Sequence, residues 1–131
     1  MTKEELMQIP TIEHNIKIQQ QELQRLEEMM EGLQGYSTDE KVQTTKKQDK
    51  MADAVAAKVD LEVLILEDIA RLLRLMIEAK KLLTKLDGED RILMELYYIR
   101  GYSWAAVAAE LEYSYEWTVK KHGKILQELF G

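Results

Sequence analysis

The last third of the chain contains three short helical patterns separated by two tight turns. The patterns run over residues 88–99, 104–111 and 115–130, and each repeats apolar residues at steps of three and four. This spacing predicts a three-helix unit whose last two helices form a helix-turn-helix. The commonest use of that motif is to lay its final helix in the major groove of DNA.

The composition is that of a mostly helical protein of one domain, or of a small domain on a long helical extension. Of 131 residues, 46% are apolar and 32% are charged, and one is proline. The chain has no cysteine, which excludes disulfides and thiolate metal sites and favours a cytoplasmic location. No apolar run is long enough for a signal peptide or a membrane span, so we expect neither.

The net charge of −6 argues against a protein that coats nucleic acid without sequence preference, because phosphate neutralisation drives such binding. The acidic excess is −3 in residues 1–86 and −3 in residues 87–131. Only the pattern at 115–130 is basic, at +1. Any contact with DNA must therefore be local.

A heptad-like apolar stripe follows Pro10. It consists of Ile12, Ile16, Leu23, Leu26, Met30 and Leu33, with Gln19 in the remaining seam position. Because proline disrupts a helix interior, we expect the helix to start at Thr11 and residues 1–10 to form a loosely ordered or short helical arm. Gly32 and Gly35 indicate where the helix ends.

A second long helix is expected after a polar connection at residues 34–50, which has almost no apolar content. It should start near Lys50 or Met51 and end at Leu86, a length of roughly 50 Å. Its first seam runs through Ala52, Val55, Val59, Glu62, Leu66, Ile69, Leu73, Met76, Lys80 and Leu83. Its second seam runs through Leu61, Ile65, Leu72, Leu75, Ala79, Leu82 and Leu86.

An apolar surface as wide as these two seams requires more than one partner helix. We expect residues 11–86 to form a long antiparallel, coiled-coil-like hairpin whose remaining face is buried by a second copy, which makes the protein a homodimer. The alternative is that residues 61–86 pack on the C-terminal helices of their own chain.

Capping and turn residues delimit the three short helices. Gly88 and Gly101 can adopt positive φ, and Ser103 and Ser114 can cap the helices that follow them. The expected inward positions are Ile92, Leu93, Leu96, Ile99, Val107, Ala108, Leu111, Tyr113, Thr118, His122, Ile125, Leu126 and Leu129.

Residues at the start of the final helix are the candidates for reading DNA. They are Ser114, Tyr115, Glu116, Trp117, Lys120, Lys121 and Lys124. Lysines can neutralise phosphate or contact guanine, and a glutamate can accept a hydrogen bond from cytosine. The alternative is a protein-binding unit in which Trp117 packs and the lysines form a solvated face. A continuous positive strip, uninterrupted by Glu116, would favour DNA.

The run IRGYSWAAVAAELEYSYEWTVKKHGKILQEL resembles region 4 of sigma-70-type factors, in the form found in ArpU/RinA-like late transcription regulators of phages and prophages of Gram-positive bacteria. The matching positions are Ile99, Gly101, Ser103, Trp104, Val107, Ala108, Tyr113, Ser114, His122 and Gly123. The segment VQTTKKQDKMADAVAAKVDLE is similar to the linking elements of these proteins, so the resemblance covers roughly residues 12–130.

The resemblance implies a sequence-specific transcription regulator that binds duplex DNA, with RNA polymerase as a possible second partner and no enzymatic activity. Several positions depart from the family pattern. Glu112 stands where glycine is usual, and Ala105 and Ala106 stand where the family has acidic residues. Lys121 stands where an apolar residue is usual, and Glu116 stands where a basic residue is frequent. A non-glycine at the turn costs about 1 kcal/mol if it adopts the left-handed conformation.

Catalytic chemistry has little support in the sequence. His14 and His122 are the only histidines, and there is no phosphate-binding loop or nucleophile motif. We expect His122 to be partly buried and bonded to a backbone carbonyl, and we expect no catalytic residue, metal, cofactor or membrane contact.

The prediction is an all-α protein: an N-terminal arm (1–10), a hairpin (11–86) and a helix-turn-helix domain (87–131). An adaptor that grips RNA polymerase or a phage protein without base contacts is the alternative function.

Overall fold

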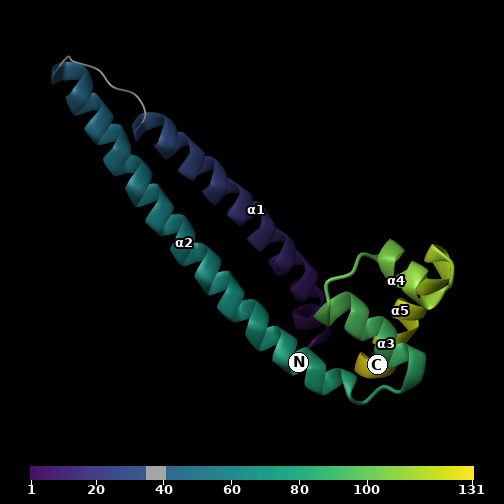
Figure 1. The fold of residues 1–131 in the computed structure, drawn as a ribbon. Helices are drawn as coiled ribbons and strands as arrows, with labels where there is room; N and C mark the ends of the chain where they lie inside the picture. The colour runs from purple at the N-terminus through teal and green to yellow at the C-terminus, as the bar shows by residue number, and fades with distance from the viewer. Residues whose placement is uncertain (35–40) are drawn as a thin grey trace. The chain divides into compact units, whose positions relative to one another are not determined.

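The computed structural model describes residues 1–34 and 41–131. Every regular element in these residues is helical, which confirms the all-α class. The elements, shown in Figure 1, are α1 (Lys3–Gln34), α2 (Lys41–Leu83), α3 (Gly88–Met94), the π-helix η1 (Glu95–Ile99), α4 (Trp104–Leu111) and α5 (Tyr115–Phe130).

Helix α1 begins at Lys3, so the predicted start at Thr11 is wrong. Thr2 and Glu5 form a capping box, in which the Glu5 amide donates to the Thr2 hydroxyl and the Thr2 amide donates to the Glu5 carboxylate, both at 3.1 Å. Pro10 lies inside the helix, where it lacks the N–H that would bond to the carbonyl four residues earlier. Residues 3–10 of the predicted arm are thus the first turns of α1.

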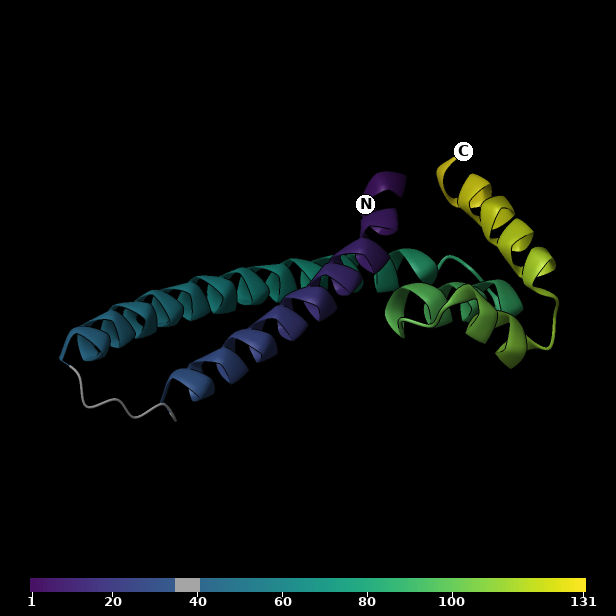
Figure 2. The same ribbon diagram turned by 90° about the horizontal axis from the view of Figure 1, so that it is seen from above.

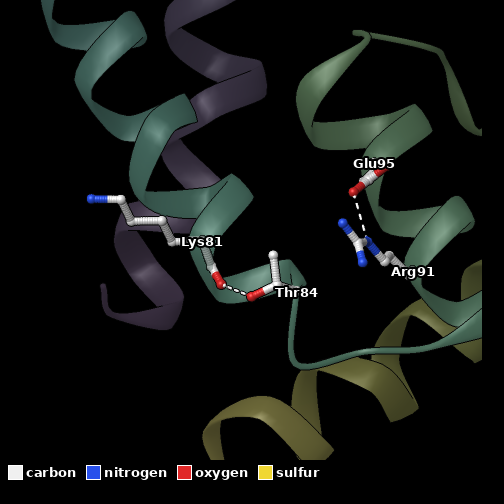
Figure 3. Close-up of polar contacts among 4 residues, drawn as sticks. All are labelled: Lys81, Thr84, Arg91 and Glu95. Atoms are coloured by element: carbon white, nitrogen blue, oxygen red, sulfur yellow. Dashed lines mark hydrogen bonds and ion pairs between the residues drawn. The ribbon is translucent and has the colours of Figure 1, made fainter.

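Helix α2 begins at Lys41, so the predicted start near Lys50 or Met51 is also wrong. The predicted polar connection at 34–50 is helical from Lys41 onward, and its residues 35–40 lie outside the described residues. At the other end, the helix stops at Leu83. The Thr84 hydroxyl donates to the Lys81 carbonyl at 2.6 Å, which satisfies one of the last free carbonyl groups of α2 (Figure 3).

The chain divides into two compact units. The first, which we call the core unit, consists of Met1–Glu13 and Arg71–Gly131, and the second, the two-helix unit, consists of His14–Ala70. The boundary predicted between residues 86 and 87 therefore falls inside the core unit. Its buried side chains come from all of its helices: Leu6, Ile9, Ile12, Leu75, Ala79, Leu83, Leu86, Leu93, Met94, Leu96, Tyr98, Val107, Ala108, Thr118, Ile125 and Leu126.

In the two-helix unit, α1 and α2 run in opposite directions (Figures 1 and 2). The predicted stripe of α1 is its least exposed side, with Ile16 buried and Leu23, Leu26, Met30 and Leu33 half-buried. Gln19 shares this seam, and its buried side-chain oxygen has no hydrogen-bond partner. Across the seam, the ammonium group of Lys58 lies 3.7 Å from the Glu27 carboxylate.

The two predicted seams of α2 differ in burial. The second seam is buried or half-buried along its whole length, as predicted. Several members of the first seam are instead exposed: Val55, Val59, Leu66 and Leu73. Within one chain, α2 therefore uses one side of its apolar surface and leaves the other in contact with solvent.

The pattern at 88–99 folds as α3 followed by the π-helix η1. Gly88 has a φ of +56°, as predicted, and Arg91 donates to the Glu95 carboxylate at 3.0 Å (Figure 3). Because residues five apart share a face of a π turn, Tyr98 joins Leu93 in the core. Ile92, predicted as inward, is 49% exposed. Leu93 and Leu96 are buried as predicted, whereas α-helical spacing placed Ile99 on the inward face and missed Tyr98.

No helix in the described residues is long and apolar enough to cross a membrane.

Candidate nucleic-acid interface

Helices α4 and α5 are joined by a turn of three residues, and both begin with a serine cap. The Ser103 hydroxyl accepts from the Ala106 amide and the Ser114 hydroxyl accepts from the Trp117 amide, each at 3.1 Å. Both caps and both helix spans are confirmed. Gly101, which precedes the first cap, has the expected positive φ of +72°.

The turn depends on Glu112, which has φ 61° and ψ 37°. This left-handed conformation is the one that a non-glycine must adopt here, and it is confirmed. It lets the Tyr113 amide donate back to the Ala108 carbonyl at 3.0 Å, which closes the end of α4. The chain can then leave α4 and enter α5 without a longer connection.

Tyr113 does not fill the core, contrary to the prediction. It is 40% exposed, its ring stacks on Trp117 with centroids 3.9 Å apart, and its hydroxyl donates to the Glu89 carboxylate at 3.0 Å. The bond to Glu89 raises the pKa of Tyr113. Tyr113 and Trp117 therefore form an aromatic pair at the surface of the turn.

The seven candidate DNA-reading residues fall into three groups. Ser114, Tyr115 and Glu116 are exposed at the start of α5, and Tyr115 is 53% exposed. Lys120 and Lys124 are exposed and form no ion pair in the described residues. Trp117 is half-buried against Tyr113, and Lys121 is half-buried with its ammonium group 3.4 Å from the Asp90 carboxylate. The structure therefore leaves five of the seven facing solvent.

The continuous positive strip that would favour DNA over a protein-binding unit is absent from α5. Lys121 is neutralised by Asp90, and Glu116 is exposed one helical turn before Lys120. Lys120 and Lys124 remain, one turn apart on the same side of the helix. This surface can hold one or two phosphates locally, but it carries too little charge to hold nucleic acid by electrostatics alone.

The inner side of α5 anchors the helix. Thr118 is fully buried and donates to the Ser114 carbonyl at 2.8 Å, while Ile125 and Leu126 are buried in the core. His122 is partly buried, as predicted, but its partner is the Tyr98 hydroxyl at 2.6 Å and not a backbone carbonyl. Burial lowers the pKa of His122 to about 4, so the imidazole is neutral at pH 7.

An aromatic cluster surrounds this histidine. Tyr97 stacks on Trp104 with centroids 3.7 Å apart, and the Trp104 ring lies 4.4 Å from that of His122. Burial raises the pKa of Tyr97 and of Tyr98, so both phenols stay protonated. The π-helix η1 carries both tyrosines, and it places Tyr97 against Trp104 of α4 and Tyr98 against His122 of α5. The cluster packs η1, α4 and α5 together and so fixes the orientation of α5.

Two features of the surface were missed by sequence reasoning. Val119, 37% exposed, lies one turn after Tyr115 and extends the outer face with an apolar contact. Its step of four from Tyr115 was a usable signal. The Asp90 partner of Lys121 had no such signal, because it lies far away along the chain.

No family model matches the chain, and comparisons with curated proteins and with solved structures return no match. In the described part of the chain, no group of three or more acidic or histidine side chains is placed to hold a metal ion.

Proposed function

We propose that the protein is a sequence-specific, DNA-binding transcription regulator of phage or prophage origin, in which α4 and α5 act as a helix-turn-helix of the sigma-70 region 4 type. The observation that carries the proposal is the outer surface of α5. Its capped start, at Ser114, Tyr115 and Glu116, is exposed, and Lys120 and Lys124, which form no ion pair in the described residues, follow at one-turn steps from Glu116.

Each exposed side chain has a chemical role in the proposal. Lys120 and Lys124 contact phosphates or guanine, Glu116 accepts a hydrogen bond from cytosine, and Tyr115 and Val119 contact thymine methyl groups. Glu116 would also repel phosphate at any register that places it against the DNA backbone. A mixed surface of this kind favours one docked position over many, which suits specific rather than general binding.

The net charge restricts the proposal to site-specific binding. A chain of net charge −6 approaches DNA against electrostatic repulsion, so its affinity must come from contacts that form only at the right site. RNA polymerase is the expected second partner of the family that the sequence resembles. An adaptor that binds polymerase or a phage protein without base contacts is the outcome if DNA binding fails.

The test is a binding assay of the full chain on fragments of the source genome across a range of salt concentrations. Wild type should select a few fragments. The double variant Lys120→Glu/Lys124→Glu should bind them at least tenfold more weakly, with a salt slope about 2 units shallower in log–log form.

The matched control is Lys80→Glu/Lys85→Glu, which changes the net charge equally at two exposed lysines outside α5. It should bind like wild type apart from a small general loss. Equal binding by both double variants would contradict the interface. Absence of DNA binding by wild type, together with binding to purified RNA polymerase, would replace the regulator with the adaptor.

A further inference from the structure

Two neighbouring acids at the start of α3 contact the turn and α5, and both contacts lie inside the core unit. The Glu89 carboxylate accepts from the Tyr113 hydroxyl, and the Asp90 carboxylate lies 3.4 Å from the Lys121 ammonium group. The first contact involves no basic group. The second joins a carboxylate to one of the three lysines of the candidate interface, so it changes the charge that this surface presents.

Lys121 lies beside the two lysines of α5 that form no ion pair in the described residues. It follows Lys120 directly and precedes Lys124 by three residues, so Lys121 and Lys124 are neighbours on the helix surface. The side chains of Lys121 and Asp90 are 31% and 26% exposed, so solvent reaches the ion pair only in part. Lys121 would extend the basic side of α5 if its charge were free, and Asp90 cancels that charge.

We infer that Asp90 is a specificity-determining residue, whose carboxylate occupies Lys121 and competes for it with the phosphates of duplex DNA. The inference rests on the proposed function, because it assigns Asp90 a role in the same interface. A carboxylate and a phosphate both offer oxygen acceptors to an ammonium group, so Lys121 exchanges one anion for another and gains little on binding DNA. Asp90 thus withholds one of three lysines from the phosphates.

The competition acts most strongly on binding without sequence preference. Such binding consists almost entirely of phosphate contacts, and a protein can shift along a random duplex until each free lysine meets a phosphate. On a selected fragment the base contacts hold α5 in one register, which limits the phosphates that Lys121 can reach. Removing the charge of Asp90 should therefore strengthen binding to a random duplex more than binding to a selected fragment. The ratio between the two affinities should fall.

The test compares Asp90→Asn with wild type, as full chains, on a random-sequence duplex and on the selected genome fragments across a range of salt concentrations. On the random duplex at about 50 mM salt, Asp90→Asn should bind about three- to tenfold more tightly, with a salt slope about 1 unit steeper in log–log form. On the selected fragments it should gain about twofold or less, because the register is fixed.

The matched control is Asp87→Asn, which makes the same change of residue and of net charge three positions earlier. Asp87 is exposed, and its side chain accepts no capping hydrogen bond. This variant should bind the random duplex within about twofold of wild type, since it releases no lysine of α5. The double variant Asp90→Asn/Lys121→Gln should also bind like wild type, because it restores the net charge and has no lysine to release.

Three results would overturn the inference: no gain for Asp90→Asn on the random duplex, an equal gain for Asp87→Asn, or a gain that persists in the double variant. Equal gains for Asp90→Asn on the random duplex and on the selected fragments would contradict its role in specificity. Failure of the proposed function gives a different result. Wild type would then select no genome fragment, while Asp90→Asn would still gain affinity for the random duplex. If no variant binds any duplex, both are wrong.

Circular dichroism checks that each variant keeps its helix content. If Asp90→Asn does not fold, the salt slopes of two lysine variants on the random duplex replace it. Lys121→Gln should leave the slope of wild type unchanged, because a lysine held by Asp90 contacts no phosphate. Lys120→Gln makes the same change one residue earlier and should make the slope about 1 unit shallower. Equally shallow slopes for the two variants would show that Lys121 already contacts DNA, and would overturn the inference.

Discussion

The core unit and the two-helix unit use the same apolar spacing and reach very different degrees of burial. In the core unit Leu6, Ile9 and Leu83 have no exposed surface. In the described residues of the two-helix unit, only Ile16 and Ile65 are buried. The reason is the number of partners, because two helices cover one side of each other whereas several short helices surround a side chain.

This difference shows that heptad spacing predicts which side of a helix is apolar but not whether that side is covered. The two seams of α2 have similar spacing in the sequence, yet one is buried and the other is largely exposed. Burial, and the stability that follows from it, is decided by what else packs there. The four predictions below measure how far the two units differ, from the largest expected effect to the smallest.

The largest expected difference comes from truncating one leucine in each unit. Leu6→Ala removes a fully buried side chain of the core unit and should lower the free energy of unfolding by about 2–5 kcal/mol. Leu23→Ala, in the half-buried seam of the two-helix unit, should cost about 1 kcal/mol. Urea denaturation followed by circular dichroism, at one fixed protein concentration, measures both. Met7→Ala, at an exposed neighbour, is the control and should change little. Equal losses for the two leucines would remove the contrast between the units.

The seam of the two-helix unit should become more stable when its orphaned polar group is removed. Gln19→Leu replaces a side chain whose buried oxygen has no partner, and should stabilise the unit by about 1–3 kcal/mol. Hydrogen exchange of the α1 amides should slow about tenfold for each 1.4 kcal/mol. The exposed residue Gln21 supplies the control, Gln21→Leu, for which exchange should be unchanged. Faster exchange in Gln19→Leu would show that the amide stabilises the seam.

The core unit should lose stability in acid through His122. Burial lowers its pKa to about 4 in the folded protein, below the usual value of about 6.5 in an unfolded chain. Between these values the unfolded chain binds the additional proton, so the free energy of unfolding falls as the pH drops from about 6.5 to 4. We expect a loss of about 1–2 kcal/mol, reduced because the ring is partly exposed.

Urea denaturation at pH 7, 5.5 and 4 measures this acid effect. His122→Gln should remove that part of the pH dependence, while His14→Gln, at an exposed site of α1, should keep it. An unchanged pH dependence in His122→Gln would show that other groups cause the acid sensitivity.

Replacing one glycine with alanine in each unit should change stability in opposite directions. Gly101 has a φ of +72°, so Gly101→Ala should destabilise the core unit by about 1 kcal/mol. The added methyl group would also meet the Glu13 carboxylate at 2.6 Å, although that flexible side chain can move. Gly32 lies in α1 with open space around it, so Gly32→Ala should stabilise that helix by up to about 1 kcal/mol. Thermal denaturation of the two variants measures these effects, as a lower melting temperature for Gly101→Ala and a higher one for Gly32→Ala. Melting temperatures that both rise or both fall would contradict this account.

Local signals in the sequence predicted local structure well. The structural effects of Ser103, Ser114 and Gly101 are confined to neighbouring residues. Both serine caps and the positive φ of the glycine are confirmed. The start of α1 was predicted wrongly because Pro10 was weighted above Thr2 and Glu5, whose capping box was visible in the sequence. In the core unit, the packing of neighbouring helices outweighs the loss of one backbone hydrogen bond.

Contacts between distant residues could not be predicted in the same way. Asp90 neutralises Lys121, Glu89 bonds to Tyr113, and Tyr98 bonds to His122. None of these pairs has a characteristic spacing, because each depends on how α3, η1 and α5 pack. The charge of the candidate interface was therefore overestimated from the sequence, although the positions of its exposed residues were mostly predicted.

The π-helix η1 is a segment of the chain from which one residue can be deleted. A π turn accommodates one residue more than an α turn over the same rise, and here the Arg100 amide bonds to the Glu95 carbonyl five residues earlier. Loss of a single residue within Glu95–Ile99 would return the segment to α-helical geometry without shortening the path to α4. This stretch can therefore lose one residue while the flanking helices keep their places.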